Sequence, residues 1–366
     1  MPRDTRRWLR LVGAANPAAG DRLLLSGLTV GSWGYRLLSG AARAYACARG
    51  RWIPSKPTLC VGNITVGGTG KTTFVRYLAR LLLGRGLRPA IVMRGYGRSR
   101  RGLLVAHDGE RPLADPAEAG DEAVMLGESL ECVPVVVGAR RIDAIQHATV
   151  DLGADVVLMD DGLQHWAVAP HSTLALWDAT LAPSAARMFP RGTLREPTSA
   201  LRRFDLVAVT RCDGPDAERV ILEVRALVGA DPVRAVHRAT GLRTAGGQVV
   251  RPESLAGTNV YAASSLGNPY AFRRSLEGLG ATVLGESVFP DHHAYSRADL
   301  AAVLGEAGRA GTECVVVTEK DLVKLRAFPE SRELSALVVD VELVGPGNAQ
   351  AVDRLLDLVL SRGRAT

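Results

Sequence analysis

A glycine-rich segment has the residue types that bind phosphate groups. Residues 60–73 read CVGNITVGGTGKTT, so a short apolar run passes through glycines to Lys71 and Thr72. Backbone N–H groups in such a turn hold di- and triphosphates with the dipole of a following helix, and the lysine and hydroxyl contact phosphates and Mg²⁺. Thr65 stands where the first glycine of the usual pattern would be. The alternative is an ordinary strand-to-helix turn, but the apolar residues on both sides favour a phosphate-binding loop.

Two aspartates end a second apolar run. Residues 156–159 are apolar and are followed by Asp160, Asp161 and a glycine. Ligand crevices of open α/β sheets lie at the carboxyl ends of strands, so these acids are placed to reach a bound Mg²⁺. Taken alone, the segment fits an Asp-Gly turn equally well. Together with Lys71 and Thr72, it indicates nucleotide and metal binding.

Two further segments carry groups suited to proton transfer. Asp121 and Glu122 precede an apolar stretch, where they either begin a helix or supply a base for a hydroxyl group. Asp291 and His292 follow an expected strand, where they form either a simple turn or an acid–base element. Taken alone, each segment fits a structural role. Their occurrence in a chain with a phosphate-binding loop favours a catalytic role.

Basic side chains also recur in the expected loops. Guanidinium groups suited to holding phosphate through two hydrogen bonds lie in the segments 94–98, 140–141 and 191–197. Four of the 45 basic residues are lysines, so a lysine within a motif stands out from the arginine-rich background. One is Lys71, and the segment TEKD at 318–321 holds another at the end of an expected strand.

The elements that must position these residues alternate between strands and helices. Strands are expected at 58–62, 89–93, 134–138, 155–159, 173–177 and 205–210, with helices between them, for example at 72–83 and 140–152. This alternation predicts an α/β fold with a doubly wound, mostly parallel sheet of the P-loop NTPase type. Two long loops, 94–121 and 182–197, interrupt the order and are expected to be functional.

After residue 240 the pattern predicts a second, smaller α/β domain. A hairpin is expected from 236–242 and 248–250, strands at 259–263, 282–289, 313–318 and 336–343, and helices at 269–278 and 297–307. We expect a nucleotide-binding domain at 46–240 and the smaller domain at 247–340, joined by a two-stranded ribbon. A final helix within 346–366 is expected to return to the first domain.

The positive charge of the chain is concentrated at its N-terminus. The 366 residues have a formal net charge of +7, and the first 56 hold ten basic and two acidic residues. Residues 1–45 combine this charge with leucines and aromatic side chains, and their apolar part is shorter than the ~20 residues that cross a bilayer. We favour an amphipathic helix on an anionic membrane surface over a helix packed on the nucleotide-binding domain. The leucines and the lack of lysine clusters argue against nucleic acid.

The cysteines indicate the compartment. Five cysteines are scattered without a Cys-x-x-Cys pair, as is typical of reduced thiols in a cytosolic environment and unlike a disulfide framework or a zinc site. A small-residue cleavage site after an apolar core is also lacking, so we do not expect a secretory signal.

Taken together, these motifs resemble the tetraacyldisaccharide 4'-kinase family, the lipid A kinases of the bacterial inner membrane, which belong to the P-loop NTPases. The matching segments occur in order and are 62–72, 94–97, 120–122, 160–165, 194–197, 267–269, 291–292 and 318–321. The family's loop also lacks the first glycine, so Thr65 agrees with it. One segment departs, because the family often has Pro-Ala-Gly-Pro where this chain has residues 189–193, which leaves the role of Arg191 open.

The resemblance implies transfer of a phosphoryl group from ATP to the 4'-hydroxyl of a tetraacylated diglucosamine 1-phosphate lipid. It assigns Asp121 as the base, His292 from the second domain as its partner, and Lys71 as the cation on the transferring group. It assigns ATP contacts to Thr65, Val66, Gly67, Gly68, Thr69, Gly70, Lys71, Thr72, Thr73, Tyr96, Arg141, Gln164 and Arg195. It assigns Mg²⁺ and its surroundings to Thr72, Glu122, Asp160, Asp161 and Glu196.

The implied location is the cytoplasmic face of the inner membrane, with the protein bound peripherally. Two other functions remain open from the residues. One is a P-loop kinase of a soluble small molecule, for which the amphipathic arm would have no purpose. The other is a membrane-associated NTP switch or ATPase, which would not need a base such as Asp121 directed at an acceptor.

Overall fold

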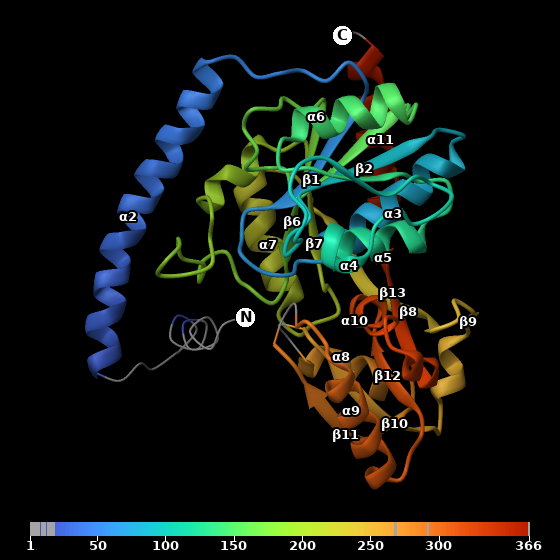
Figure 1. Ribbon diagram of the computed structural model, residues 1–366. Helices are drawn as coiled ribbons and strands as arrows, with labels where there is room; N and C mark the ends of the chain where they lie inside the picture. The colour runs from blue at the N-terminus through green and yellow to red at the C-terminus, as the bar shows by residue number, and fades with distance from the viewer. Residues whose placement is uncertain (1–7, 9–11, 13–18, 267–268, 291–292, 365–366) are drawn as a thin grey trace.

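A computed structural model describes residues 8, 12, 19–266, 269–290 and 293–364 of the chain. Figure 1 shows two lobes, a larger one drawn mainly in blue to yellow and a smaller one drawn in orange to red below it. One sheet of 13 strands runs through both lobes. A long helix, α2 (Ala19–Ala48), stands beside the larger lobe at the left of the view.

The strands follow the expected positions closely. They are β1 (Thr58–Asn63), β2 (Pro89–Met93), β3 (Leu104–His107), β4 (Val135–Val137), β5 (Val156–Asp160), β6 (Ser172–Asp178), β7 (Leu206–Thr210), β8 (Val233–Thr244), β9 (Val249–Val250), β10 (Asn259–Ser264), β11 (Thr282–Val288), β12 (Val315–Thr318) and β13 (Leu334–Leu343). Their order in the sheet is β11-β10-β12-β13-β8-β7-β6-β1-β5-β2-β4-β3, with β9 paired to β8. The expected mostly parallel, doubly wound α/β sheet is confirmed.

Helices cover both faces of the sheet in the larger lobe. The remaining helices are α3 (Lys71–Gly84), α4 (Pro116–Ala119), α5 (Asp121–Ser129), α6 (Arg141–Gln146), α7 (Ala217–Val228), α8 (Pro269–Gly278), α9 (Arg297–Ala310), α10 (Glu319–Leu325) and α11 (Asn348–Arg364). One core packs α3, α5 and α11 on one face, through Phe74, Leu126 and Leu356 among others. The other core packs α6 and α7 on the opposite face, through Ile145, Val220 and Trp177.

The strand β1 lies at the centre of the larger lobe, and every residue of it is buried. It pairs in parallel with β5 on one side and β6 on the other. Parallel strands covered on both faces read as continuous apolar runs, which explains why residues 58–62 were recognisable as a strand. The carboxyl ends of β1, β5 and β6 therefore meet at one edge of the sheet.

An antiparallel pair of long strands joins the lobes. The first residues of β8 pair in parallel with β7, and the rest of β8 pairs antiparallel with β13 from Ser335 to Leu343. The expected hairpin with β9 is present, but β9 has only two residues, so the joining ribbon is formed by β8 and β13. In the smaller lobe β10, β11, β12 and β13 are parallel.

The long loop expected at 94–121 contains regular structure, which corrects that prediction. The strand β3 within it pairs antiparallel with β4 at the edge of the sheet, and α4 follows. The expected helix at 140–152 also differs, because its regular α-helical part ends at Gln146 and residues His147–Asp151 form a wider π turn. The helix α10 was not predicted; its N-terminus is capped by Thr318, whose hydroxyl accepts a hydrogen bond from Asp321 N.

The helix α2 turns one face toward the larger lobe and the other toward solvent. Leu25 and Ser32 are buried on the first face. The opposite face exposes Leu23, Val30 and Leu37 by 80%, 67% and 74%, which is unusual for aliphatic side chains on one helix face. Among the described residues, no helix is long and apolar enough to span a membrane.

Candidate active site

The phosphate-binding loop lies between β1 and α3. Gly70 precedes α3 with a φ of 80°, a left-handed conformation that favours glycine. A Cβ on Gly70 would also lie 2.3 Å from Nε2 of His237, so the position leaves no room for a side chain. Lys71 is the first residue of α3, which places its ammonium group at the positive end of the helix dipole beside the loop amides.

Polar side chains fix the shape of this loop. Asn63 donates a hydrogen bond from Nδ2 to the Thr65 hydroxyl at 3.1 Å, and its Oδ1 accepts one from Lys71 Nζ at 3.3 Å. On the other side, the Thr210 hydroxyl donates to the Thr69 carbonyl at 3.0 Å. Asn63 thus holds both the start of the loop and its lysine, a role that the sequence did not predict for it.

The two aspartates at the carboxyl end of β5 differ in their surroundings. Asp161 has a φ of 47°, which is unusual for a residue other than glycine, and lies 3.8 Å from Lys71 Nζ. Asp160 is 3% exposed, and its Oδ1 has no hydrogen-bond partner among the described residues. Burial, followed by the charge of Glu122, raises the pKa of Asp160 to about 7.

These acids fit a divalent cation. A buried carboxylate oxygen without a partner is costly unless a cation or donor reaches it, and Glu122 lies close enough to act on Asp160. Among the described residues, no group of three or more His, Cys, Asp or Glu side chains is placed to hold a metal by itself. Mg²⁺ in nucleotide sites commonly uses one or two carboxylates together with water and substrate phosphates.

A chain of hydrogen bonds extends the site on the side of the 182–197 loop. Arg195 lies 3.3 Å from Asp161 and also 3.3 Å from the Gln164 side-chain oxygen. Gln164 donates to Glu196 Oε1 at 2.8 Å, and the other oxygen of Glu196 accepts from Arg203. Both oxygens of Glu196 are therefore engaged, and its position favours holding Gln164 over ligating the metal directly.

The predicted base begins the helix α5. Asp121 is 7% exposed, and its Oδ1 accepts a hydrogen bond from Glu122 N at 3.0 Å. Gly120 precedes it with a φ of 96°, and a Cβ there would lie 3.0 Å from the Tyr96 carbonyl. The loop that carries Tyr96 is thus packed on the start of α5, while the Tyr96 side chain is exposed.

Arg141 is a buried basic residue that interacts electrostatically with Asp160 and Asp161. Its side chain is buried and donates to the Gly138 carbonyl. Burial lowers the pKa of Arg141, and the charges of Asp160 and Asp161 partly oppose this effect. The positive charge of Arg141 therefore acts directly on the two aspartates.

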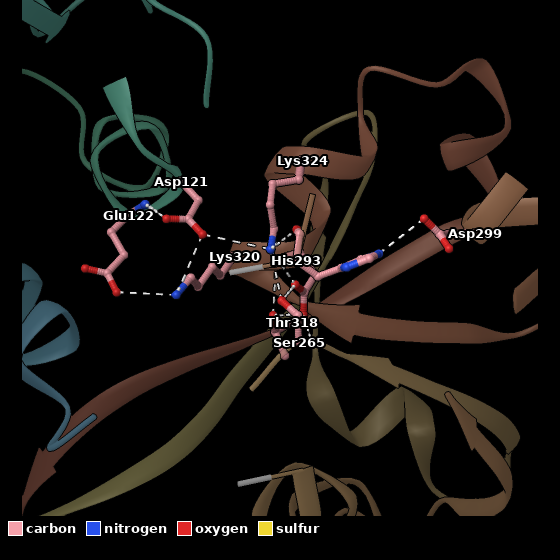
Figure 2. A network of polar contacts seen from close by, with 9 residues as sticks. Asp121, Glu122, Ser265, His293, Asp299, Thr318, Lys320 and Lys324 are labelled. Atoms are coloured by element: carbon pink, nitrogen blue, oxygen red, sulfur yellow. Dashed lines mark hydrogen bonds and ion pairs between the residues drawn. The ribbon is translucent and has the colours of Figure 1, made fainter. Parts of the chain in front are cut away.

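Two lysines of the smaller lobe reach the predicted base, as Figure 2 shows. Lys320 Nζ lies 3.7 Å from Asp121 Oδ2 and 3.6 Å from Glu122 Oε1. Lys324 Nζ lies 3.9 Å from Asp121 Oδ2. The sequence drew attention to Lys320 through the TEKD segment and the scarcity of lysine, but nothing in it indicated this partner.

The predicted partner of Asp121 cannot be placed. Asp291 and His292 lie outside the described residues. The next residue, His293, stacks on Phe289 and contacts Asp299 Oδ2 through Nε2 at 3.2 Å. Its carbonyl accepts a hydrogen bond from Lys324 Nζ at 3.2 Å.

The segment 187–194, which contains Arg191 whose role the sequence left open, connects α2 to the phosphate-binding loop. The Ser32 hydroxyl on α2 donates to the Met188 carbonyl at 2.9 Å and accepts from Arg191 N at 3.1 Å. At the other end of the segment, the Thr193 carbonyl accepts from Val66 N at 2.7 Å. Arg191 thus contacts α2 through its backbone, and its guanidinium group donates to the Val12 carbonyl at 3.5 Å.

Two residues at the site were missed by sequence reasoning. Arg211 follows β7 with a φ of 58°, donates to the Gly68 carbonyl at 3.0 Å and forms an ion pair with Asp178. His237 on β8 contacts the Thr73 hydroxyl at 3.2 Å, and burial lowers its pKa to about 4. An arginine just after one strand and a single histidine within another carry no sequence signal for such positions.

Comparisons with known proteins match nearly the whole length of this chain. The family model described as Tetraacyldisaccharide-1-P 4'-kinase matches residues 24–360. A tetraacyldisaccharide 4'-kinase of an Anaeromyxobacter species is 39% identical over 364 residues, 94% of either chain. Another, from Geobacter metallireducens, is 36% identical and covers 92% of this chain and 99% of the relative.

A solved structure agrees with these sequence matches. The crystal structure of the "apo" form of LpxK from Aquifex aeolicus in complex with ATP superposes with a TM-score of 0.77 and 28% identity. The match covers 92% of this chain and 99% of that chain. The chain therefore belongs to the Tetraacyldisaccharide-1-P 4'-kinase family.

Proposed function

We propose that this kinase transfers the γ-phosphoryl group of ATP to the 4'-hydroxyl of a tetraacylated diglucosamine 1-phosphate, a step of lipid A biosynthesis. The observation that carries the proposal is the meeting of two features at one edge of the sheet. Lys71 at the phosphate-binding loop contacts Asp161, and Glu122 beside the predicted base Asp121 acts on Asp160. The proposed nucleotide site and the proposed proton acceptor are therefore adjacent.

The loop amides between Thr65 and Thr73 would hold the phosphates of ATP, with Lys71 neutralising charge on the transferring group. Arg195 and Arg141 would add positive charge near Asp161. Gln164 lies against Arg195, and Tyr96 lies in the loop beside α5. Because phosphoryl transfer needs little covalent help from a protein, such positioning and charge neutralisation account for most of the catalysis.

The magnesium ion would be held by Thr72, Asp160 and Asp161, with Glu122 close by and Glu196 further out. When bound, Mg²⁺ would neutralise the phosphate oxygens and orient them for transfer. The unpartnered buried oxygen of Asp160 supports this assignment, because a cation there would offset the cost of burying the carboxylate.

Asp121 would accept the proton of the 4'-hydroxyl as the new oxygen–phosphorus bond forms and the bond from the γ-phosphorus to the β,γ-bridging oxygen breaks, which releases ADP. His292 would orient Asp121 and share the proton, as the family resemblance implies. We assign the nucleotide-binding domain to residues 46–240 and the smaller domain to 247–340, so closure of the two domains would assemble this pair.

The exposed apolar face of α2 supports attachment to a membrane. Leu23, Val30 and Leu37 lie on this face, and Arg22 and Arg36 are on the same helix to meet anionic headgroups. We propose that residues 1–45 bind peripherally to the cytoplasmic face of the bacterial inner membrane, where the lipid acceptor resides. Nucleic acid is not among the proposed partners.

Product analysis tests the function. The protein is incubated with ATP, Mg²⁺ and a tetraacyl diglucosamine 1-phosphate in detergent, and the lipid is examined by mass spectrometry. We expect one added phosphate on the non-reducing sugar. Phosphorylation of soluble sugars alone would favour a small-molecule kinase, and ATP hydrolysis without any phosphorylated acceptor would favour a switch or ATPase.

Vesicle flotation tests the arm. Val30, Trp33 and Leu37 are exposed, so changing all three to Ser should release the protein from anionic vesicles without loss of ATP binding. Leu25→Ser is the matched comparison, since Leu25 packs toward the lobe and its loss should affect stability and not flotation. Unchanged flotation of the triple variant would remove the membrane assignment of this face.

A further inference from the structure

The chain uses lysine sparingly and places most of it at one point. Four of its 45 basic residues are lysines, and three of these, Lys71, Lys320 and Lys324, lie within 4 Å of Asp121, Glu122 or Asp161. Lysine offers a compact charge with three donors, whereas arginine is planar and longer. Because the chain is rich in arginine, the presence of lysine at this cluster distinguishes these positions from the surface ion pairs.

Lys324 is the centre of a buried polar network in the smaller lobe. Its ammonium group lies 3.0 Å from Asp321, donates to the Ser265 hydroxyl at 2.9 Å and donates to the His293 carbonyl at 3.2 Å. It also lies 5.1 Å from the centre of the Tyr295 ring. These contacts come from the segments that follow β10, β11 and β12, so the position of Lys324 is fixed by three strand ends.

The same ammonium group points out of the smaller lobe toward Asp121 (Figure 2). Lys320, one helical turn earlier on α10, contacts both Asp121 and Glu122. Lys320 and Lys324 are 13% and 12% exposed, and the Asp121 side chain is 8% exposed. Water screens ion pairs at this depth much less than at the surface, so the carboxylate is held strongly.

We propose that Lys320 and Lys324 are positioning residues for Asp121: they hold its carboxylate in the orientation that accepts the proton of the acceptor hydroxyl. The inference rests on the proposed role of Asp121 as the base. Because the lysines belong to the smaller lobe and Asp121 to the larger, the base is correctly oriented only while α10 lies on α5. A base mispositioned by about 1 Å loses much of its rate advantage.

The alternative is that the lysines only stabilise the contact between the two lobes. The same contact between α5 and α10 offers a control, because Arg326 just after α10 forms an ion pair with Glu128 near the end of α5. This pair also joins the lobes but lies at the other end of α5 from Asp121. Loss of adhesion should appear equally in variants of Arg326 and of the lysines, whereas loss of base positioning should appear only in the latter.

The test compares Lys320→Met, Lys324→Met and Arg326→Met in the full-length enzyme. ATP affinity, KM for the lipid, single-turnover phosphorylation and thermal unfolding are measured for each. We expect the lysine variants to lower the single-turnover rate about 10- to 100-fold with ATP affinity changed less than about twofold. Lys320→Arg, which keeps the charge on a longer, planar group, should recover part of the rate. Arg326→Met should change the unfolding temperature and leave the rate near that of the unmodified enzyme.

A second measurement keeps the proposal falsifiable if Lys324→Met unfolds easily. Each lysine change is repeated in an Asp121→Ala background, where we expect no further loss of the residual rate, because there is no carboxylate left to position. An additional loss equal to that in the unmodified enzyme, or equal losses in Arg326→Met, would overturn the inference. If Asp121→Ala itself keeps a normal rate, the proposed base is wrong; if Asp121→Ala is inactive and the lysine variants are not, only the present inference fails.

Discussion

In both lobes of this protein, the carboxyl ends of parallel strands lie together at one edge of the sheet. The two edges differ in whether the oxygens of their buried carboxylates all have hydrogen-bond partners. In the smaller lobe, Asp321 is fully buried and accepts hydrogen bonds from Ser265 N and from the Ser265 and Thr318 hydroxyls. In the larger lobe, buried Asp160 keeps an oxygen without a partner among the described residues. Protein groups thus satisfy the buried carboxylate of the smaller lobe, whereas the buried carboxylate of the larger lobe keeps an oxygen available to a ligand.

This difference separates two uses of buried carboxylates. A buried charge is tolerated when protein groups compensate it, and then it fixes the local structure. A buried charge left incomplete costs stability and persists where a cation or substrate completes it. We therefore expect changes at Asp160 in the larger lobe to reduce activity and changes at Asp321 in the smaller lobe to reduce stability.

The largest effect should follow from Lys71→Ala. We expect a folded protein with turnover reduced about 10²- to 10³-fold at saturating ATP, because the ammonium group acts on charge that develops during transfer. Steady-state kinetics and circular dichroism measure the two properties. Lys56→Ala, at an exposed lysine outside the site, should behave as the unmodified enzyme. A Lys71→Ala enzyme with near-normal turnover would mean that this edge is not the phosphate site.

We expect Asp121 of the nucleotide-binding domain and His292 of the smaller domain to act as one catalytic unit. Removing either side chain should lower kcat strongly, about 10²-fold or more, and removing both should cost little beyond the worse single change. ATP affinity should change little in all three variants, since neither residue is assigned to the nucleotide. Single-turnover kinetics of the double-mutant cycle measures the coupling. Fully additive losses would show that the two groups act separately.

Asp160→Asn tests the proposed role of Asp160 as a Mg²⁺ ligand. We expect lower activity and a higher Mg²⁺ concentration for half-maximal rate, because a charged oxygen ligand is lost. Asp155→Asn is a suitable comparison, since Asp155 lies just before β5 at the opposite end from the site and pairs with Arg88 at the surface. Identical Mg²⁺ titrations for the two variants would make Asp160 a structural residue.

Asp321→Asn should show the opposite behaviour. Lys324 would lose its 3.0 Å partner in a buried network, and we expect a decrease of about 3 kcal/mol in the free energy of unfolding with ATP affinity preserved. Urea denaturation and nucleotide titration measure the two quantities. Asp353→Asn, which removes an exposed partner of Arg85, should cost less than about 1 kcal/mol. Weakened ATP binding without loss of stability would contradict a structural role for Asp321.

The smallest effect concerns His237 on β8, between the two edges. Burial lowers its pKa from 6.5 to about 4, so the folded protein binds a proton there less readily than the unfolded chain. Its contribution to stability is therefore complete above pH 6.5 and is lost as the pH falls toward 4, by about 3 kcal/mol at most. His237→Gln should unfold with a weaker pH dependence over this range than the unmodified protein, as followed by urea denaturation at several pH values. If the free energy of unfolding changes by the same amount between pH 7 and pH 4.5 in the variant and in the unmodified protein, His237 is not a buried neutral side chain.

Much of the larger lobe follows from contiguous residues. The phosphate-binding loop, the apolar runs around it and the aspartates at the carboxyl end of β5 each lie within one short segment, so composition and order reveal them. The same holds for the alternation that predicts a parallel sheet with helices on both faces. The strand β3 was missed because four residues in a polar, glycine-containing loop carry too weak a pattern, and pairing with β4 decides its structure.

The sequence by itself determined the phosphate chemistry, the acidic residues and the presence of a second α/β unit. Tertiary structure decided which oxygens are left without partners, that Glu196 holds Gln164, and that Lys320 and Lys324 reach Asp121. These contacts join residues far apart in the chain, and their geometry depends on how β8 and β13 set one lobe against the other. Local patterns record the conformation of a segment, but a contact between segments depends on the packing of the whole sheet, which no single segment encodes.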